Sequence, residues 1–411
     1  MLNNNLYMKI GNRRIKLFDF TWILFLGVLP FDKAALTLFT NSSLGEVISI
    51  SLNAITLFGA FVCYLYSHTK TQKKVAQKYI SFFVVLAITY LFAGFVDEII
   101  ITRFFSLICL LGYYIFAICH YKGTDKLIRD INKAAFFIIL LSTVLYIAGD
   151  NNVMYTEKAS KMVFKGIAAN RNSYSEISLF FIATNFYIWR QEKKWSLWRF
   201  LTTLLAVYTT FLTNGATSII CVCLLLLLLL VCNNRVFSKI YSFNFFALIY
   251  IVLFCVIVLS QYTDVGVLQY ISTLFGKTTS MTGRTDIWAT TIASISKSPI
   301  FGLGYDTSVL LNQGIYENDP HNGLLYIVLT QGIIGLITFI GMLLFVIKNS
   351  KNYKHRNNNA YMTMLAFIVV WLIKGLVESA FSYSHFVFWC ALIIMELCIY
   401  DMADKNYEQL F

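Results

Sequence analysis

A histidine and an arginine in the carboxyl-terminal half of the chain stand where their side chains could do chemistry. His321 follows Asp319 and Pro320 at the start of a long apolar run. The positive end of a helix disfavours the charged imidazolium, so a histidine there stays neutral and can accept a proton. Arg284 stands just before a short segment of helical periodicity, where a guanidinium and a helix amino terminus together suit a phosphate. The plainer alternatives are a capping or packing histidine and a salt bridge from Arg284 to a loop acid.

A second basic group lies near the middle of the chain. Lys158, Lys161, Lys165 and Arg171 have a spacing that suits one face of a helix, and Asn172 follows them. A basic stripe of this kind can meet a diphosphate or the anionic head groups of lipids.

Three cations interrupt apolar runs, at Lys33, Arg103 and Lys374. A cation at the centre of a membrane span costs ~2.5–3.5 kcal/mol, and all three lie toward one end of their run. They could rim an outward cavity for an anionic ligand, or they could extend to the lipid head groups. Lys374 could also pair with Glu378 at a spacing of i,i+4. Carboxylates at the same level could neutralise the cations: Asp32, Asp97, Glu98 and Glu378.

The elements that must position these residues are membrane helices. Of the 411 residues 58% are hydrophobic and 13% are charged, with a mean hydropathy of +0.67. This composition excludes a soluble enzyme, a disordered chain and a protein with a single anchor. The runs lack the alternation of barrel strands, so we expect an all-α, polytopic helix bundle of about twelve transmembrane helices. The twelve runs are 18–39, 45–67, 79–96, 99–120, 134–149, 173–189, 198–213, 216–232, 244–260, 321–347, 360–377 and 383–400.

The run 134–149 is short for a span and is expected to extend into the loop that follows it. The first run does not resemble a cleaved signal, because charges and a proline interrupt it and no cleavage site follows. The nine cysteines fall in or beside apolar runs without a CxxC, which favours buried packing over a disulfide framework or a metal site. We therefore expect one integral membrane domain over residues 1–411.

The distribution of Lys and Arg orients these spans. The loops on one side hold 23 of them and those on the other side hold 7, with three inside spans. The positive-inside rule then places both termini in the cytoplasm. The net charge of +12 is explained in the same way, without nucleic acid. Two long loops face outward, residues 150–172 and residues 261–320 between spans 9 and 10, and the active site is expected there.

The larger outer loop contains a predicted amphipathic helix. Ile287, Trp288, Ile292 and Ile295 fall on one helical face, with Thr285 or Asp286 as cap and Pro299 as stop, and we expect this helix to lie at the outer surface.

The residues after this helix predict a tight turn and aromatic contacts. Gly302-Leu303-Gly304 predicts the turn, and it is not a dinucleotide motif because no strand precedes it. Tyr305 follows, and like other outer tyrosines it could stack on a sugar or anchor the chain at the interface.

The series Gly283-Arg284-Thr285-Asp286-Ile287-Trp288, Pro299, Gly302-x-Gly304, and His321-Asn322 with Gly332 and Gly335 resembles the O-antigen ligase/polymerase superfamily of bacterial membrane proteins. The likeness is best over about residues 280–340. Asn170-Arg171-Asn172 and Glu378 resemble weaker landmarks of that family. Its Ser-Arg-Gly-type segment is replaced by Thr213-Asn214-Gly215-Ala216-Thr217, which lacks the arginine, and Lys33, Arg103 or Lys374 is our hypothesis for the missing cation.

The resemblance implies a glycosyltransferase without metal or cofactor. It would make His321 the base that takes a proton from an acceptor hydroxyl. Arg284 and Arg171 would bind the diphosphate of an undecaprenyl-linked glycan, and a single displacement would invert the sugar carbon. The other substrate-binding candidates are Asn172, Lys165, Arg103, Lys374, Glu378 and Tyr305.

Three functions remain open at this point. The first is an O-antigen or capsular polysaccharide polymerase in the bacterial inner membrane, whose partners are lipid-linked oligosaccharide, membrane lipids and a chain-length regulator protein. The second is a ligase that moves glycan to lipid A-core. The third, a flippase for lipid-linked glycan, would need charges near span centres and paired broken helices.

Overall fold

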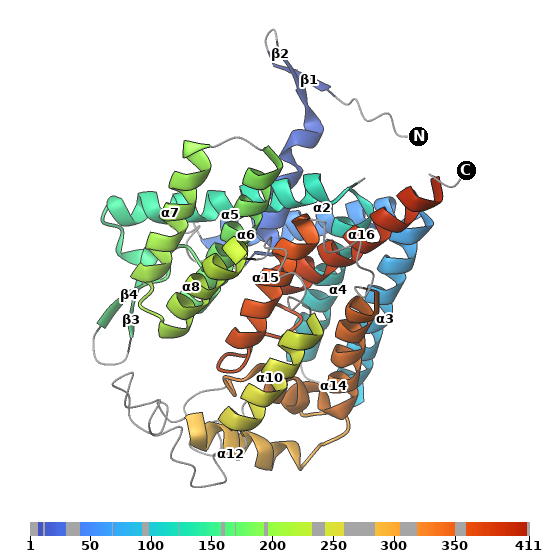
Figure 1. Ribbon diagram of the computed structural model, residues 1–411, viewed down its shortest axis with the longest axis vertical. Helices are drawn as coiled ribbons and strands as arrows, with labels where there is room; N and C mark the ends of the chain where they lie inside the picture. Colours follow the sequence, from blue (N-terminus) through green and yellow to red (C-terminus); the bar gives the residue numbers. More distant parts are fainter. Residues whose placement is uncertain are drawn as a thin grey trace. The chain divides into compact units, whose positions relative to one another are not determined.

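The computed structural model describes residues 7–10, 13–29, 42–67, 69–92, 98–121, 123–157, 161–168, 170–192, 196–231, 243–258, 284–304, 319–349 and 359–408. The described part is almost entirely helical (Figure 1), and the prediction of an all-α bundle is confirmed. The chain divides into two compact units, Met1–His68 with Gly112–Val222 and Thr69–Leu111 with Cys223–Phe411.

The first unit is built mainly from α2, α5, α6 and α7. Its helices are the 3-10 helix η1 (Leu17–Gly27), α2 (Ser42–Leu65), α5 (Thr124–Ile147), the short η2 (Asn151–Val153), α6 (Arg171–Glu192) and α7 (Leu197–Leu212). Helix α6 packs against both α5 and α7. Fourteen of the side chains of α6 are buried, including Glu176 and Asn185, so it is the central helix of this unit.

The second unit contains α3, α10, α12, α14, α15 and α16. Their bounds are α3 (Lys70–Phe92), α10 (Phe243–Val258), α12 (Arg284–Ile295), α14 (Gly323–Asn349), α15 (Asn359–Lys374) and α16 (Phe386–Glu408). Helices α15 and α16 pack closely against each other, and most of their described side chains are buried. Helices α4 (Glu98–Cys119) and α8 (Ala216–Val231) each have residues in both units.

Eleven of the twelve predicted spans coincide with an α-helix. The first span differs, because its described part is the 3-10 helix η1, and residues 30–41 lie outside the described residues. The run 134–149 was expected to extend into the loop that follows it, and this was wrong. Helix α5 ends at Ile147 and extends in the other direction, to Thr124. The basic residues Lys126, Arg129 and Lys133 made this segment read as a loop. In the structure Asp130 and Asn132 of this segment are buried, and Tyr121 donates to Asp130 (3.1 Å) while Asn132 donates to Thr184 (2.9 Å).

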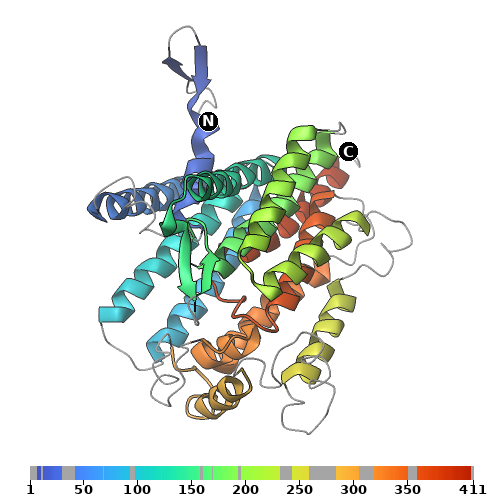
Figure 2. The same ribbon diagram turned by 90° about the vertical axis from the view of Figure 1, so that its left-hand side faces the viewer.

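Two antiparallel hairpins accompany the helices, and their arrows are visible in Figure 2. One joins β1 (Tyr7–Ile10) to β2 (Arg13–Lys16), and the other joins β3 (Met154–Glu157) to β4 (Lys161–Phe164), with Met154 opposite Phe164. The second hairpin corrects the expected helical stripe of lysines in the loop 150–172. Lys161 lies in a strand, Lys165 follows it, and Lys158 lies outside the described residues.

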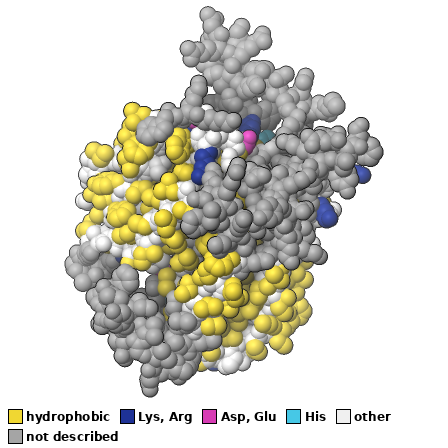
Figure 3. Space-filling model, viewed as in Figure 1, with side chains coloured by type: hydrophobic (Ala, Val, Ile, Leu, Met, Phe, Trp, Pro, Cys, Tyr) yellow, Lys and Arg dark blue, Asp and Glu magenta, His cyan; other side chains and the backbone are white. Residues whose placement is uncertain are grey.

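The surface and the helix lengths suit a lipid bilayer. By length and composition three described helices can cross a membrane, Lys70–Phe92, Thr124–Ile147 and Gly323–Leu344, and seven shorter described helices are also apolar. Hydrophobic side chains cover much of the described surface on the face shown in Figure 3. On α2, for example, Phe58 is 72% exposed and Phe61 is 62% exposed. In water such a surface would aggregate, so we describe the chain as an integral membrane protein.

Helix α14 is broken at Gly332, whose φ of 63° and ψ of −163° are not helical. The segment that follows α12 fills the break. Ile333 and Ile334 donate their N–H groups to the carbonyls of Pro299 (2.9 Å) and Ile300 (3.3 Å). In return, the carbonyls of Leu329 and Thr330 accept from Leu303 (2.7 Å) and Gly304 (3.0 Å).

Four backbone groups at the break therefore find partners in the segment 299–304. This satisfies the requirement that backbone polar groups be paired away from water. It also holds the turn Gly302–Gly304 in place, as the sequence predicts, with positive φ at both glycines. The close approach requires Gly302 and Gly332, because a Cβ on either would overlap backbone atoms of the other segment.

Candidate active site

His321 is held in an uncommon backbone conformation just before α14. Its φ is 47°, in the left-handed region where histidine is more frequent than most residues. Its N–H donates to Asp319 Oδ1 (2.8 Å), and Ser379 Oγ donates to the same oxygen. Trp288 Nε1 donates to the carbonyl of Pro320 (2.7 Å). The residues on both sides of His321 are thus fixed, which orients its imidazole.

Asn322 connects the start of α14 to the segment after α15. Its Oδ1 accepts from the N–H groups of Leu324 (3.1 Å) and Leu325 (3.0 Å), as an N-cap does. Its Nδ2 donates to the carbonyl of Leu376 (3.0 Å), and the side chain is fully buried. One residue thus caps the helix and anchors the chain next to His321.

Replacing Asn322 by alanine should lower the free energy of unfolding by about 1–3 kcal/mol, because the cap is lost and a buried carbonyl loses its donor. Thermal unfolding of the purified variant in detergent measures this. Asn322→Asp keeps the cap acceptor but loses the donor, and at neutral pH it buries a charge, so it should not restore stability. Equal melting temperatures for wild type and Asn322→Ala would show that the cap is unimportant.

Glu378 lies beside the imidazole of His321. Its Oε2 is 3.7 Å from Nδ1 of His321, within the range of an ion pair but longer than a hydrogen bond. The side chains of His321 and Glu378 are 22% and 13% exposed, so both are largely shielded from solvent. A carboxylate next to one ring nitrogen leaves the other nitrogen as the proton acceptor, a pattern typical of a general base.

The connection between α15 and α16 is what brings Glu378 to this position. The helix ends at Lys374, whose carbonyl accepts from Glu378 N–H (3.0 Å), and Trp371 Nε1 donates to Ala380 O (2.6 Å). Gly323 N–H donates to Gly375 O (2.7 Å), which joins the start of α14 to this turn. Phe381 packs directly on both glycines, so a side chain at either would displace its ring.

Helix α12 packs against the start of α14, next to His321. Ile287 and Trp288 are buried with Leu325 of α14, and Ile292 and Ile295 pack against this cluster. The predicted amphipathic helix is therefore confirmed, but its apolar face covers α14 and does not depend on lipid for burial.

The amino terminus of α12, at Arg284, is connected to the segment that carries His321. The helix begins at Arg284, one turn before Trp288, and the indole of Trp288 binds the carbonyl that precedes His321. The start of α12 and His321 therefore belong to the same end of this unit. The side chain of Arg284 lies outside the described residues.

Lys374 is buried, at 1% exposure, and its Nζ lies 5.1 Å from the centre of the Trp371 ring. The alternative in which Lys374 extends to lipid head groups is therefore wrong, because its side chain turns into the protein and packs on an aromatic face. It lies at the end of α15, four residues before Glu378. The lysine side chain is thus buried in the same turn that presents Glu378.

In the first unit, Arg171 is the first residue of α6 and Asn172 is the second. The side chain of Asn170 caps this helix, since its Oδ1 accepts from Ser173 N–H (2.9 Å). Lys165, Arg171 and Asn172 are all half-buried. A capped helix terminus with an arginine in its first turn can bind an anion. Arg171 thus resembles Arg284 in its place at the start of a helix.

The remaining predicted site residues are only partly described. Arg103 lies in α4, but its side chain is outside the described residues, as are Tyr305 and Lys33. Within the part of the chain that the structure describes, no group of three or more His, Cys, Asp or Glu side chains could hold a metal ion.

Sequence reasoning did not assign roles to Asp319, Asn322, Ser379 and Trp288, which position His321. Asp319 and Asn322 flank the histidine, and an Asp-Pro-His-Asn-Gly run before an apolar segment is a visible capping signal. Ser379 and Trp288 carry no such signal, because their contacts with Asp319 and Pro320 span 60 and 32 residues.

Part of the chain is similar to known proteins. Residues 200–340 match the family described as O-antigen ligase, which extends the likeness beyond residues 280–340. A 98-residue stretch is 32% identical to an O-antigen ligase of Pseudomonas aeruginosa, and it covers 23% of this chain and 24% of that relative. The matched region thus spans about a quarter of the curated relative. The family match includes Arg284 and His321, whereas Arg171, Lys374 and Glu378 lie outside it.

Proposed function

We propose, because residues 200–340 match the family described as O-antigen ligase, that this chain is a membrane glycosyltransferase of the O-antigen ligase/polymerase superfamily and polymerises lipid-linked saccharide repeats. The donor is a glycan on undecaprenyl diphosphate, and the acceptor is a sugar hydroxyl of another lipid-linked repeat. The site is at the periplasmic face of a bacterial inner membrane, with both termini in the cytoplasm. A chain-length regulator protein is the partner we expect for such a polymerase.

The proposed reaction is a single displacement. The acceptor hydroxyl oxygen attacks the anomeric carbon of the donor as the bond to the diphosphate oxygen breaks. Nε2 of His321 takes the hydroxyl proton, and the lipid diphosphate leaves with the electron pair. One displacement inverts the anomeric carbon. Negative charge accumulates on the departing diphosphate, and Arg284 and Arg171 are the cations we assign to it.

The observation that supports this proposal most is the environment of His321. Its backbone is fixed by Asp319 and Trp288, and Glu378 lies 3.7 Å from Nδ1. A histidine that only packs or caps would not need a carboxylate beside one ring nitrogen. The other substrate-binding residues we propose are Asn172, Lys165, Arg103, Lys374 and Tyr305.

A gene-deletion strain tests the proposal. Loss of a polymerase should leave lipopolysaccharide core that carries a single repeat, and the wild-type gene should restore long chains. Gel analysis of extracted lipopolysaccharide measures this. Long chains of normal length in the deletion strain would contradict a polymerase.

A ligase is the second candidate, because both the matched family and the Pseudomonas relative are described as O-antigen ligases. The chemistry at His321 would be the same, and only the acceptor would change to lipid A-core. Deletion separates the two functions, since loss of a ligase leaves polymer on the lipid carrier and bare core.

A flippase receives less support from the structure. Helix α14 is broken as in some transporters, but its released backbone groups bind residues 299–304 of the same chain and do not face a substrate path. A flippase would also form no new glycosidic bond in detergent, where no membrane separates two compartments.

Replacing Glu378 by glutamine should reduce kcat by about tenfold to a hundredfold, because the amide stabilises the protonated imidazole less well than a carboxylate does. For the same reason the acidic limb of the pH–rate profile should move to lower pH. Rates of glycan transfer by the purified variant between pH 5 and 9 measure both effects. Since a purely structural role would lower the amount of folded protein without moving the limb, an unmoved limb would contradict the assignment.

A further inference from the structure

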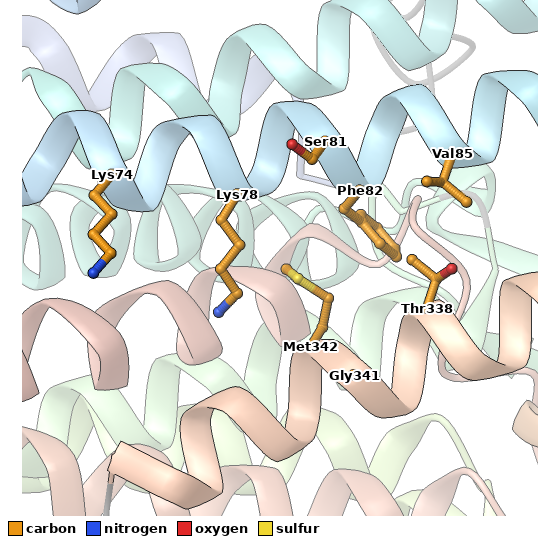
Figure 4. Close-up of a pocket in the computed structure, with 8 residues that line it drawn as sticks. All are labelled: Lys74, Lys78, Ser81, Phe82, Val85, Thr338, Gly341 and Met342. Atoms are coloured by element: carbon orange, nitrogen blue, oxygen red, sulfur yellow. The ribbon is translucent and has the colours of Figure 1, made fainter.

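A groove of about 360 Å³ runs between α3 and α14 in the second unit (Figure 4). Lys74, Lys78, Ser81, Phe82 and Val85 line it from α3, and Thr338, Gly341 and Met342 line it from α14. The polar end and the apolar end of the groove are separate. The two lysines extend from α3 at one end, Met342 and Phe82 lie in the middle, and Val85 and Thr338 lie at the other end.

The lysine end of the groove is basic, although Glu396 balances the charge of Lys78. Helix α3 carries Lys70, Lys73, Lys74 and Lys78 in its first nine residues and has no acidic residue. Lys78 forms an ion pair with the buried Glu396 of α16, so this lysine is held in place at the floor of the groove. Lys74 is exposed and lies one turn nearer to the amino terminus of α3. A ligand with a negative group at this end and an apolar body complements these charges.

The apolar end of the groove has unfilled space. A Cβ added to Gly341 would meet no atom within 4 Å, although this glycine lies in the middle of a long helix. Glycine costs a helix about 1 kcal/mol relative to alanine, and no close backbone approach requires it here. The length from Lys74 to Val85 is about 16 Å along the helix, which accommodates much of an acyl chain.

The helices that form the groove also indicate where its ligand comes from. Both α3 and α14 are long and apolar enough to cross a membrane, and the lysines stand in the first turns of α3. The basic end of the groove therefore lies at the level of lipid head groups and its apolar end at the level of the acyl chains. A soluble ligand would not need the apolar end of the groove.

We propose that the groove binds one anionic glycerophospholipid, with the phosphate at Lys74 and Lys78 and an acyl chain along Phe82, Val85 and Gly341. The positive-inside orientation makes this a lipid of the cytoplasmic leaflet, on the membrane side opposite to the reaction at His321. The bound lipid fills the space between α3 and α14 and stabilises their packing.

Native mass spectrometry of the delipidated full-length protein tests this, with phosphatidylglycerol and phosphatidylcholine of equal acyl chains as probes. One phosphatidylglycerol should bind more tightly than phosphatidylcholine. Lys74→Gln should weaken phosphatidylglycerol binding about fivefold, as expected for one lysine near a membrane surface. Lys73→Gln removes the same charge from an exposed neighbour that does not line the groove, and it should leave binding unchanged.

Gly341→Leu tests the apolar end independently of charge. A leucine fits the open space and should abolish binding of both lipids, while the unfolding temperature in detergent stays the same or rises. Three results would overturn the proposal. The two lipids could bind equally, Lys73→Gln and Lys74→Gln could weaken binding equally, or Gly341→Leu could leave binding unchanged. Displacement of the lipid by millimolar inorganic phosphate alone would show a free-phosphate site and would also overturn it.

Discussion

Asparagine in place of His321 should reduce glycan transfer at least about a hundredfold while the protein stays folded. The choice of asparagine separates chemistry from folding. Residue 321 has a φ of 47°, and asparagine adopts this conformation more readily than most residues. Its amide can still make hydrogen bonds but cannot accept the proton of a sugar hydroxyl. The rate is measured with purified protein and lipid-linked repeats, together with its melting temperature.

His120→Gln provides the control for this experiment. His120 is a half-buried histidine whose ring stacks on Phe116, and it has no part in the proposed reaction. This variant should transfer glycan at close to the wild-type rate. Full activity of His321→Asn, or an equal loss in His120→Gln, would show that the imidazole of His321 is not the base.

Replacing Gly332 by alanine should cause the largest loss of stability among the substitutions considered. A non-glycine residue at its φ of 63° costs roughly 1–2 kcal/mol, and the new Cβ would overlap the carbonyl of Ile300. The segment 299–304 would then separate from α14 and leave four backbone groups without their partners. We expect a loss of several kcal/mol, seen as a lower melting temperature and a lower yield of folded protein.

Gly341→Ala is the matched control on the same helix. Gly341 has open space around its Cα and no positive φ, so alanine there should be neutral or should stabilise by about 0.5–1 kcal/mol. If both substitutions lowered the melting temperature equally, the docking of 299–304 into the break would not be what stabilises α14.

Most of the helices could be predicted because a lipid-embedded backbone must satisfy its own polar groups. Apolar runs bounded by charge therefore gave α2, α4 and α16 to within a few residues, apart from the polar carboxyl end of α16. The early start of α5 could not be read in this way. The segment is rich in lysine and arginine, and the burial of Asp130 and Asn132 there through contacts with Tyr121 and Thr184 is not visible in the sequence.

In the candidate site, too, local sequence patterns predicted some features, whereas contacts between residues far apart in the chain could not be predicted. The approach of Trp288 to Pro320 and of Glu378 to His321 depends on residues 32 and 57 positions apart, and composition says nothing about such pairs. Local patterns did predict the amphipathic helix and the glycine turn 302–304. They did not predict that this turn would fill a break in α14. The expected cap at Thr285 or Asp286 was wrong, because the helix already begins at Arg284.

Lys374 illustrates why a span charge is hard to interpret from sequence. A cation near the end of an apolar run usually extends to the membrane surface. Here it turns inward onto Trp371 and is 1% exposed, in the turn that also presents Glu378. Whether a cation faces lipid or protein depends on which helix packs on it, and that is a tertiary property.

The central claim is that His321 is the base in a glycan transfer that releases lipid diphosphate. The most direct measurement follows a purified reaction by mass spectrometry, and it quantifies new glycosidic bonds and free lipid diphosphate in the same sample. The account predicts one lipid diphosphate released for each bond formed by the wild-type chain, and neither product with His321→Asn. Unchanged lipid-linked repeats in the wild-type reaction, or equal products from His321→Asn, would contradict it.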